Sequence, residues 1–101
     1  MLAFRLTAKA KNDLKKIARY TEGTWGKNQR NIYLKEIDNT FHLLSDTPSL
    51  GIECNFIREN YKKFPQGSHI IFYRSGSISK IEIIRILHKN MDVFSKFQGH
   101  A

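Results

Sequence analysis

The chain has 101 residues, of which 41% are hydrophobic, so it is long enough for one domain and too apolar for an intrinsically disordered protein. Its 17 Lys and Arg residues outnumber 9 Asp and Glu residues, and a net charge of +8 favours an acidic partner, either nucleic acid or an acidic protein. The lone Cys54 excludes an internal disulfide and fits a reducing compartment. Because we find no signal peptide and no run of transmembrane length, we expect a cytoplasmic protein without a membrane partner.

The first half of the sequence begins with a predicted strand and helix. Residues 2–6 are a candidate strand, and the hydroxyl of Thr7 is a candidate N-cap for the helix that follows. Gly26 is expected to end that helix, because a residue without Cβ tolerates the backbone of a helix terminus. The helix carries one apolar face, with members at three- and four-residue steps, consisting of Ala10, Leu14, Ile17, Thr21 and Trp25.

A second helix is predicted from about Asn28 to the sequence Asp46-Thr47-Pro48, where the proline prevents its continuation. The connection to the first helix is short, so the two helices should form an antiparallel hairpin. The apolar face of this helix consists of Tyr33, Ile37, Phe41 and Leu44.

The second half predicts an antiparallel sheet of about three strands after a loop over residues 49–55. Residues 56–58 and 61–64 are short strand candidates, either separate or parts of one bent strand. Residues 69–74 and 80–87 are rich in Ile, Tyr and Phe and are joined by a Ser/Gly turn. The predicted fold is therefore a single α+β domain over residues 1–101, in the order β-α-α-β-β-β.

The last predicted strand is apolar on both faces, which is typical of a central strand covered on both sides. The helix hairpin can cover one face. The other face is either a groove for a partner or is covered by residues 91–97 folding back, and the sequence leaves both alternatives open.

The sequence contains few patterns that are typical of a catalytic or metal site. The sequence has no Gly-rich phosphate loop and no zinc motif, and its four histidines are far apart, so we expect no metal site and no cofactor. Metal-free RNA cleavage stays open, because it needs only a base, an acid and cations near the phosphate. Whether the candidates converge depends on the hairpin register, which the sequence does not set; they are His69, His88, Tyr73, Arg74 and Arg85.

Each of these residues also has a structural interpretation. Tyr73 is typical of a strand aromatic in the core. Arg85 lies between isoleucines and must be exposed, paired or functional, because an unpaired buried cation is costly. His88 leaves the last strand and is either a capping residue or a site residue.

Two segments of the second half have a distinctive pattern. The first reads Phe64-Pro65, then His69-x-Ile71-x-Tyr73-Arg74, and the second reads Ile86-Leu87-His88-x-x-Met91-Asp92. Both resemble the ParE toxins of the RelE/ParE superfamily of bacterial toxin–antitoxin modules. The first helix also contains Asp13-Leu14-x-x-Ile17, which is similar to the opening of the family. The predicted order of elements is that of the superfamily, so the resemblance covers nearly the whole chain.

The resemblance implies a toxin that poisons DNA gyrase by trapping cleaved DNA, rather than an enzyme. RelE-like members, which cut messenger RNA on the ribosome, place an arginine where this chain has Ile70, and they carry a basic tail with a late tyrosine that this chain lacks. The implied partner is a ParD-like antitoxin, whose flexible acidic half wraps the toxin; DNA would be contacted only indirectly. A ribosome-dependent ribonuclease is the alternative, and a degenerate toxin that only binds antitoxin is a third hypothesis.

Two surfaces are expected on this basis. The gyrase surface should lie at the C-terminal exit of the sheet, with Arg85, His88, Lys89, Met91 and Asp92 as members and Arg58 and Arg74 as basic neighbours. The antitoxin should lie along the lysines of the first helix and then on the open edge or face of the sheet, in contact with Lys9, Lys15, Lys16 and Tyr73.

Overall fold

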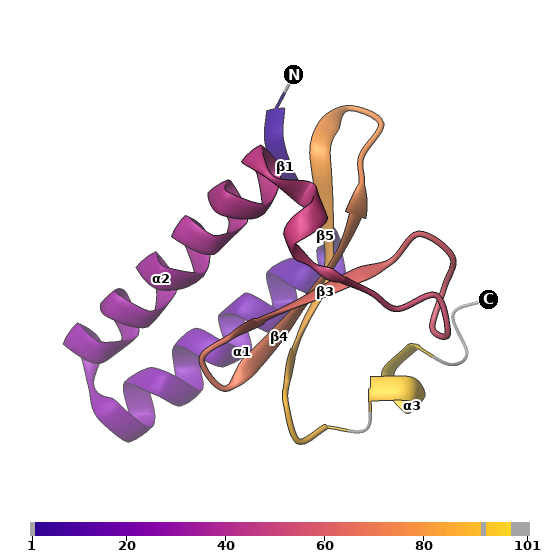
Figure 1. Ribbon diagram of the computed structural model, residues 1–101. Helices are drawn as coiled ribbons and strands as arrows, with labels where there is room; N and C mark the ends of the chain where they lie inside the picture. The colour runs from indigo at the N-terminus through magenta and orange to yellow at the C-terminus, as the bar shows by residue number, and fades with distance from the viewer. Residues whose placement is uncertain (1, 92, 98–101) are drawn as a thin grey trace.

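The structure, a computed structural model, describes residues 2–91 and 93–97 and has the predicted α+β architecture. A helix hairpin lies on one side of a sheet, and a short helix with a long loop lies on the other (Figure 1). In chain order the elements are β1 (Leu2–Leu6), α1 (Ala8–Trp25), α2 (Lys27–Asp46), the 3-10 turn η1 (Pro48–Leu50), β2 (Ile52–Glu53), β3 (Lys62–Gln66), β4 (His69–Ser75), β5 (Ser79–His88) and α3 (Val93–Phe97).

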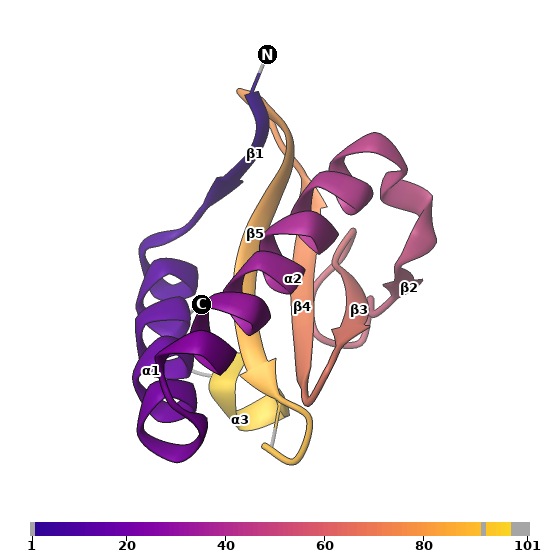
Figure 2. The same cartoon turned by 90° about the vertical axis from the view of Figure 1, so that its left-hand side faces the viewer.

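The sheet has five strands in the order β1-β5-β4-β3-β2, as Figure 2 shows behind the helices. The pairs β2–β3, β3–β4 and β4–β5 are antiparallel, whereas β1 is parallel to β5. The sheet is therefore larger than the predicted three strands, because the N-terminal strand joins it and β2 extends its other edge. With β1 and β4 as neighbours, β5 is an interior strand of the sheet, as its two apolar faces predicted.

An irregularity in β5 decides which of its residues face the helices. The register with β4 shifts between Phe72, which lies opposite Arg85, and Tyr73, which lies opposite Ile83. An extra residue in one strand reverses the alternation of side chains beyond it. Ile83 and Ile86 consequently pack in the same core cluster, although three residues separate them.

The helix boundaries follow the predicted local signals. The Thr7 hydroxyl accepts a hydrogen bond from the Ala10 backbone N–H at 3.1 Å and donates one to the Ile84 carbonyl at 2.8 Å, so the N-cap of α1 is also fixed to β5. Gly26 has φ of 91°, a backbone conformation that glycine adopts without strain, and it separates the two helices. Helix α2 ends at Asp46, before Pro48.

The two faces of the sheet are covered in different ways. The larger core cluster lies between the sheet and the helix hairpin, and includes Ile17, Ile37 and Phe41. The smaller cluster, on the opposite face, consists of buried residues of the loop and sheet with Val93 and Phe97 packed against them. Of the two alternatives left open, residues 93–97 therefore do fold back over the second face.

Three expectations about local structure were wrong. Residues 56–58 form turns instead of a strand, because backbone hydrogen bonds close locally between Ile57 and Cys54 and between Tyr61 and Arg58. Ile52–Glu53 is a strand inside the predicted loop. The Trp25 side chain, assigned to the apolar face of the first helix, is 70% exposed. The helix continues to the tip of the hairpin, which projects beyond the sheet in Figure 1.

Candidate functional site

A groove of about 850 Å³ lies between the helix hairpin and one end of the sheet, where β4 begins and β5 ends. Its wall on α1 carries two aromatic side chains that are mostly exposed, Tyr20 at 69% and Trp25 at 70%. Exposed aromatic side chains beside a concavity are typical of an interaction site. The groove is further lined by Lys16, Tyr33, His69, His88 and Met91.

Two histidines meet at the floor of this groove because the hairpin register pairs them. His69 begins β4 and lies directly opposite His88, which ends β5. Their ring centroids are 5.5 Å apart and their planes are nearly perpendicular, at 83°. The sequence left open whether the candidate residues for RNA cleavage converge. The pairing of these strand ends brings two of them, His69 and His88, together.

Tyr33 of α2 holds the ring of His69 in place. Its hydroxyl lies 2.7 Å from Nδ1 of His69 and donates to the Gln66 carbonyl at 2.9 Å. A tyrosine has one hydroxyl hydrogen, so Nδ1 of His69 is the donor to the Tyr33 oxygen. The neutral imidazole of His69 therefore keeps Nε2 as an acceptor.

Burial sets the protonation of this cluster. It lowers the pKa of His69 below the ordinary value for an imidazole, and nearby His88 lowers it further, while Asp13 opposes the shift. His69 is consequently neutral at pH 7. Burial also raises the pKa of Tyr33, so its hydroxyl stays protonated.

A second polar cluster joins α1 to β5 close by. Asp13 accepts two hydrogen bonds from the guanidinium of Arg85, at 2.8 Å from Nε and 3.0 Å from the terminal nitrogen, and a third from the Ile86 backbone N–H at 3.0 Å. The two side chains are only 7% and 15% exposed. Of the three possibilities left open for Arg85, which were exposed, paired or functional, the structure shows the paired one. The guanidinium is held by Asp13 inside the fold.

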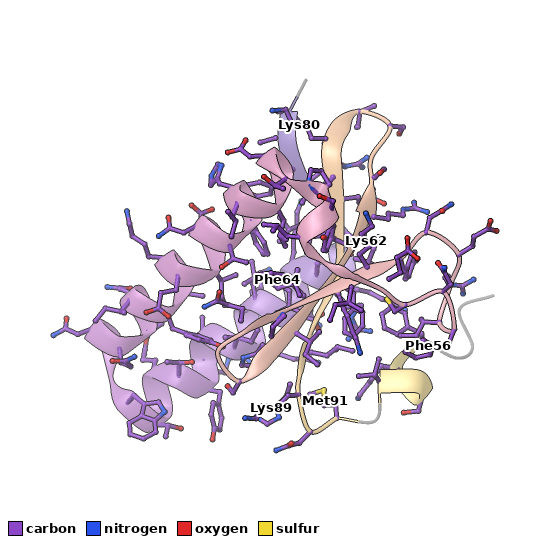
Figure 3. The ribbon with its side chains drawn as sticks, in the orientation of Figure 1. Phe56, Lys62, Phe64, Lys80, Lys89 and Met91 are labelled. Carbon is purple, nitrogen blue, oxygen red and sulfur yellow. The ribbon has the colours of Figure 1, made fainter. Side chains whose placement is uncertain are left out.

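The remaining gyrase candidates do not form one patch. Arg74 pairs with Glu82 at 2.9 Å, at the end of the β4–β5 hairpin away from His88, and Arg58 is exposed on the loop before β3. Lys89 and Met91 are exposed on the loop after β5, at the opposite end of the molecule from Lys80 (Figure 3). Asp92 lies outside the described residues. Of the candidates that the structure describes, His88, Lys89 and Met91 are neighbours at the exit of the sheet.

The antitoxin candidates divide in a similar way. The lysines of α1 are exposed, and Lys16 lines the groove. Tyr73, in contrast, is 1% exposed, and its hydroxyl donates to the Pro48 carbonyl at 2.6 Å and accepts from the Gly51 N–H at 2.8 Å. Tyr73 offers no surface to a partner, and its side chain instead anchors η1 to the sheet.

The set proposed for RNA cleavage is incomplete for the same reasons. His69 and His88 share the groove, but Tyr73 is in the core and the guanidinium groups of Arg74 and Arg85 are held in ion pairs. Among the described residues, no three His, Cys, Asp or Glu side chains gather as a metal-binding group. No described helix is long and apolar enough to cross a membrane.

The sequence and the fold are similar to those of known toxins. The sequence model of the family described as the ParE toxin of the type II toxin–antitoxin system, parDE, matches residues 4–93. Toxin ParE1 of Caulobacter vibrioides is 37% identical over 92 residues, which is 91% of this chain and 94% of the relative. Toxin ParE1 of Mycobacterium tuberculosis is 34% identical over 90 residues, 89% and 92% of the two chains. A solved chain of the chromosomal ParDE system from P. aeruginosa superimposes with a TM-score of 0.72 at 18% identity, covering 87% of this chain and 96% of that one.

Proposed function

The chain belongs to the ParE toxin family of type II toxin–antitoxin systems, and we propose that it inhibits DNA gyrase in the cytoplasm and is neutralised by a ParD-like antitoxin. The observation that carries the proposal is the family match, which extends over residues 4–93 and so includes the sheet, apart from the first two residues of β1, and its exit. RNA cleavage is less favoured, because Ile70 stands where RelE-like members place an arginine, and Arg74 and Arg85 are both held in ion pairs.

The groove is the proposed site for the antitoxin. None of the described residues that line it is acidic, while Lys16 supplies a cation at its wall and Tyr20 and Trp25 supply apolar surface. An acidic segment with apolar side chains is complementary to such a groove, and a segment that folds on binding can wrap the surface. Lys9 and Lys15, exposed on α1, extend the basic surface along the helix.

The gyrase contact is proposed at the loop after β5, with Lys89 and Met91 as its exposed members. His88 and Met91 also line the groove. An antitoxin segment in the groove would therefore cover part of the surface that gyrase needs. Neutralisation then follows from competition for the same residues, without any change in the fold of the toxin.

Purified gyrase with plasmid DNA tests this proposal. The chain should cause cleaved plasmid to accumulate, and the antitoxin should abolish that accumulation. The double variant Lys89→Ala, Met91→Ala should poison gyrase at least tenfold more weakly while keeping a native melting curve. Lys80→Ala, which removes an exposed lysine at the other end of β5, is the matched control and should act like the wild type.

A ribosome-dependent ribonuclease is the second candidate, and the convergence of His69 and His88 is the observation that favours it. Rapid cleavage of messenger RNA in a translating extract, with gyrase unaffected, would replace the first proposal with this one. A folded chain that binds the antitoxin but affects neither gyrase nor RNA would support the third hypothesis, a toxin that has lost its activity.

A further inference from the structure

We propose that the His69–His88 pair is the specificity-determining element of the groove: it recognises a carboxylate of the antitoxin, and His69 takes up a proton when that carboxylate binds. The inference rests on the proposed antitoxin function and adds to it a chemical feature of the partner and a dependence on pH.

The hydrogen bonds of the two rings place one donor and one acceptor at the pair. The Asn90 backbone N–H donates to Nδ1 of His88 at 3.1 Å, so the hydrogen of His88 is on Nε2. The Nδ1–H of His69 is directed to Tyr33, which leaves its Nε2 without a hydrogen in the neutral ring. A carboxylate that reaches the pair therefore finds one donor at His88 and gains a second only when His69 becomes protonated.

Among the described residues, no carboxylate is paired with the ring of His69, and Asp13 only partly opposes the lowering of its pKa. Helix α1 contributes Lys16 and Asp13, and the carboxylate of Asp13 is already held by Arg85. Helix α2 contributes the Tyr33 hydroxyl, with Glu36 close to that tyrosine. The turn before β4 contributes the Ser68 hydroxyl at 3.4 Å from Nδ1, and β5 contributes His88. The missing counter-charge is what a carboxylate of the partner would supply.

The direction of the pH effect follows from linkage. In the free chain, burial and His88 hold the pKa of His69 below its ordinary value, so the ring is neutral at pH 7. A bound carboxylate favours the charged ring and raises this pKa in the complex. Binding then takes up a proton, and affinity rises as the pH falls from about 8 through the ordinary imidazole pKa of about 6.5, where antitoxin carboxylates remain ionised.

The test is the affinity of the cognate antitoxin for the chain at pH 8.0 and pH 6.0, measured by calorimetry in two buffers of different ionisation enthalpy. The wild type should bind roughly five- to tenfold more tightly at pH 6.0, since one unit of pKa corresponds to about tenfold in affinity. The heat should reveal proton uptake near pH 7. In the double variant His69→Asn, His88→Asn, both effects should disappear.

Asparagine is chosen because its side chain can replace Nδ1 of each ring toward Tyr33 and Asn90, so the variant should fold. A melting curve checks this, and His88→Asn alone is the milder second variant. His42→Asn is the matched control, because His42 lies on α2 outside the groove and its side chain is 58% exposed. It should keep the pH dependence of the wild type.

An affinity of the wild type that is equal at both pH values would overturn the inference, as would a pH dependence that persists in the folded double variant. Cleavage of RNA that is lost in the double variant would assign the pair to catalysis and would also overturn it. Failure of the antitoxin to bind at either pH contradicts the proposed function itself. The two failures are therefore distinguishable.

Discussion

Arg85 and His88 are three residues apart on β5, and their environments differ completely. Arg85 is mostly buried, and its guanidinium donates two hydrogen bonds to the carboxylate of Asp13 between α1 and the sheet. His88 is open, because it lines the groove opposite His69 with no acidic neighbour among the described lining residues. The exit of the sheet therefore combines a structural polar cluster with the proposed recognition cluster, and the two need different experiments.

The largest effect on stability should come from breaking the ion pair between Asp13 and Arg85. Asp13→Ala leaves the Arg85 cation buried without its partner and removes the acceptor of the Ile86 N–H, so we expect a loss of about 3–5 kcal/mol in the free energy of unfolding. Urea denaturation measures it. Asp38→Ala, at an aspartate of α2 whose side chain is 59% exposed, is the control and should change stability by less than about 0.5 kcal/mol. A loss below about 1 kcal/mol for Asp13→Ala would show that the pair is not structural.

The two faces of β5 should differ in the cost of a cavity. Ile86 is 2% exposed in the cluster under the helices, so Ile86→Ala should cost about 2–5 kcal/mol. Ile84 is only partly buried on the second face, and Ile84→Ala should cost less, about 1–2 kcal/mol. Equal losses in thermal or urea denaturation would mean that the second face is packed as tightly as the first.

The smallest effect is the dependence of stability on pH that His69 contributes. Its folded-state pKa is lowered by burial, so the unfolded chain binds the proton more tightly. The contribution of the neutral ring is complete above the unfolded pKa of about 6.5 and is lost as the pH falls through the folded-state pKa. Between pH 7 and pH 5 the wild type should therefore lose more stability than His69→Asn. Parallel stability curves for the two proteins would contradict this.

Local signals in the sequence were sufficient for most of the fold. The Thr7 hydroxyl, Gly26 and Pro48 each act within a few residues of their own position, and they set the helix boundaries as predicted. The sequence could not indicate how far the hairpin projects beyond the sheet, so it predicts Trp25 on the apolar face of the first helix, although this side chain is 70% exposed beside the groove.

The site was harder to predict because its contacts are distant in sequence. Asp13 and Arg85 are 72 positions apart, and Tyr33 and His69 are 36 apart. Asp13 lies three residues after Ala10 and four before Ile17, on the apolar face of the first helix. A carboxylate in that position indicates a buried cationic partner, because an unpaired buried charge is costly. The register shift in β5 left no comparable signal, and it decides which side chains share a face.

The affinity of the antitoxin for groove variants tests the account most directly. Tyr20→Ala with Trp25→Ala removes the exposed aromatic wall without touching the core, and Phe56→Ala removes an aromatic that is 66% exposed outside the groove. If the groove holds the antitoxin, the double variant should keep its melting temperature and bind the antitoxin at least about thirtyfold more weakly. This loss is expected for two interface aromatics that each contribute more than about 1 kcal/mol to binding. Phe56→Ala should bind the antitoxin like the wild type. Unchanged affinity in the folded double variant would contradict the account and place the antitoxin on another surface.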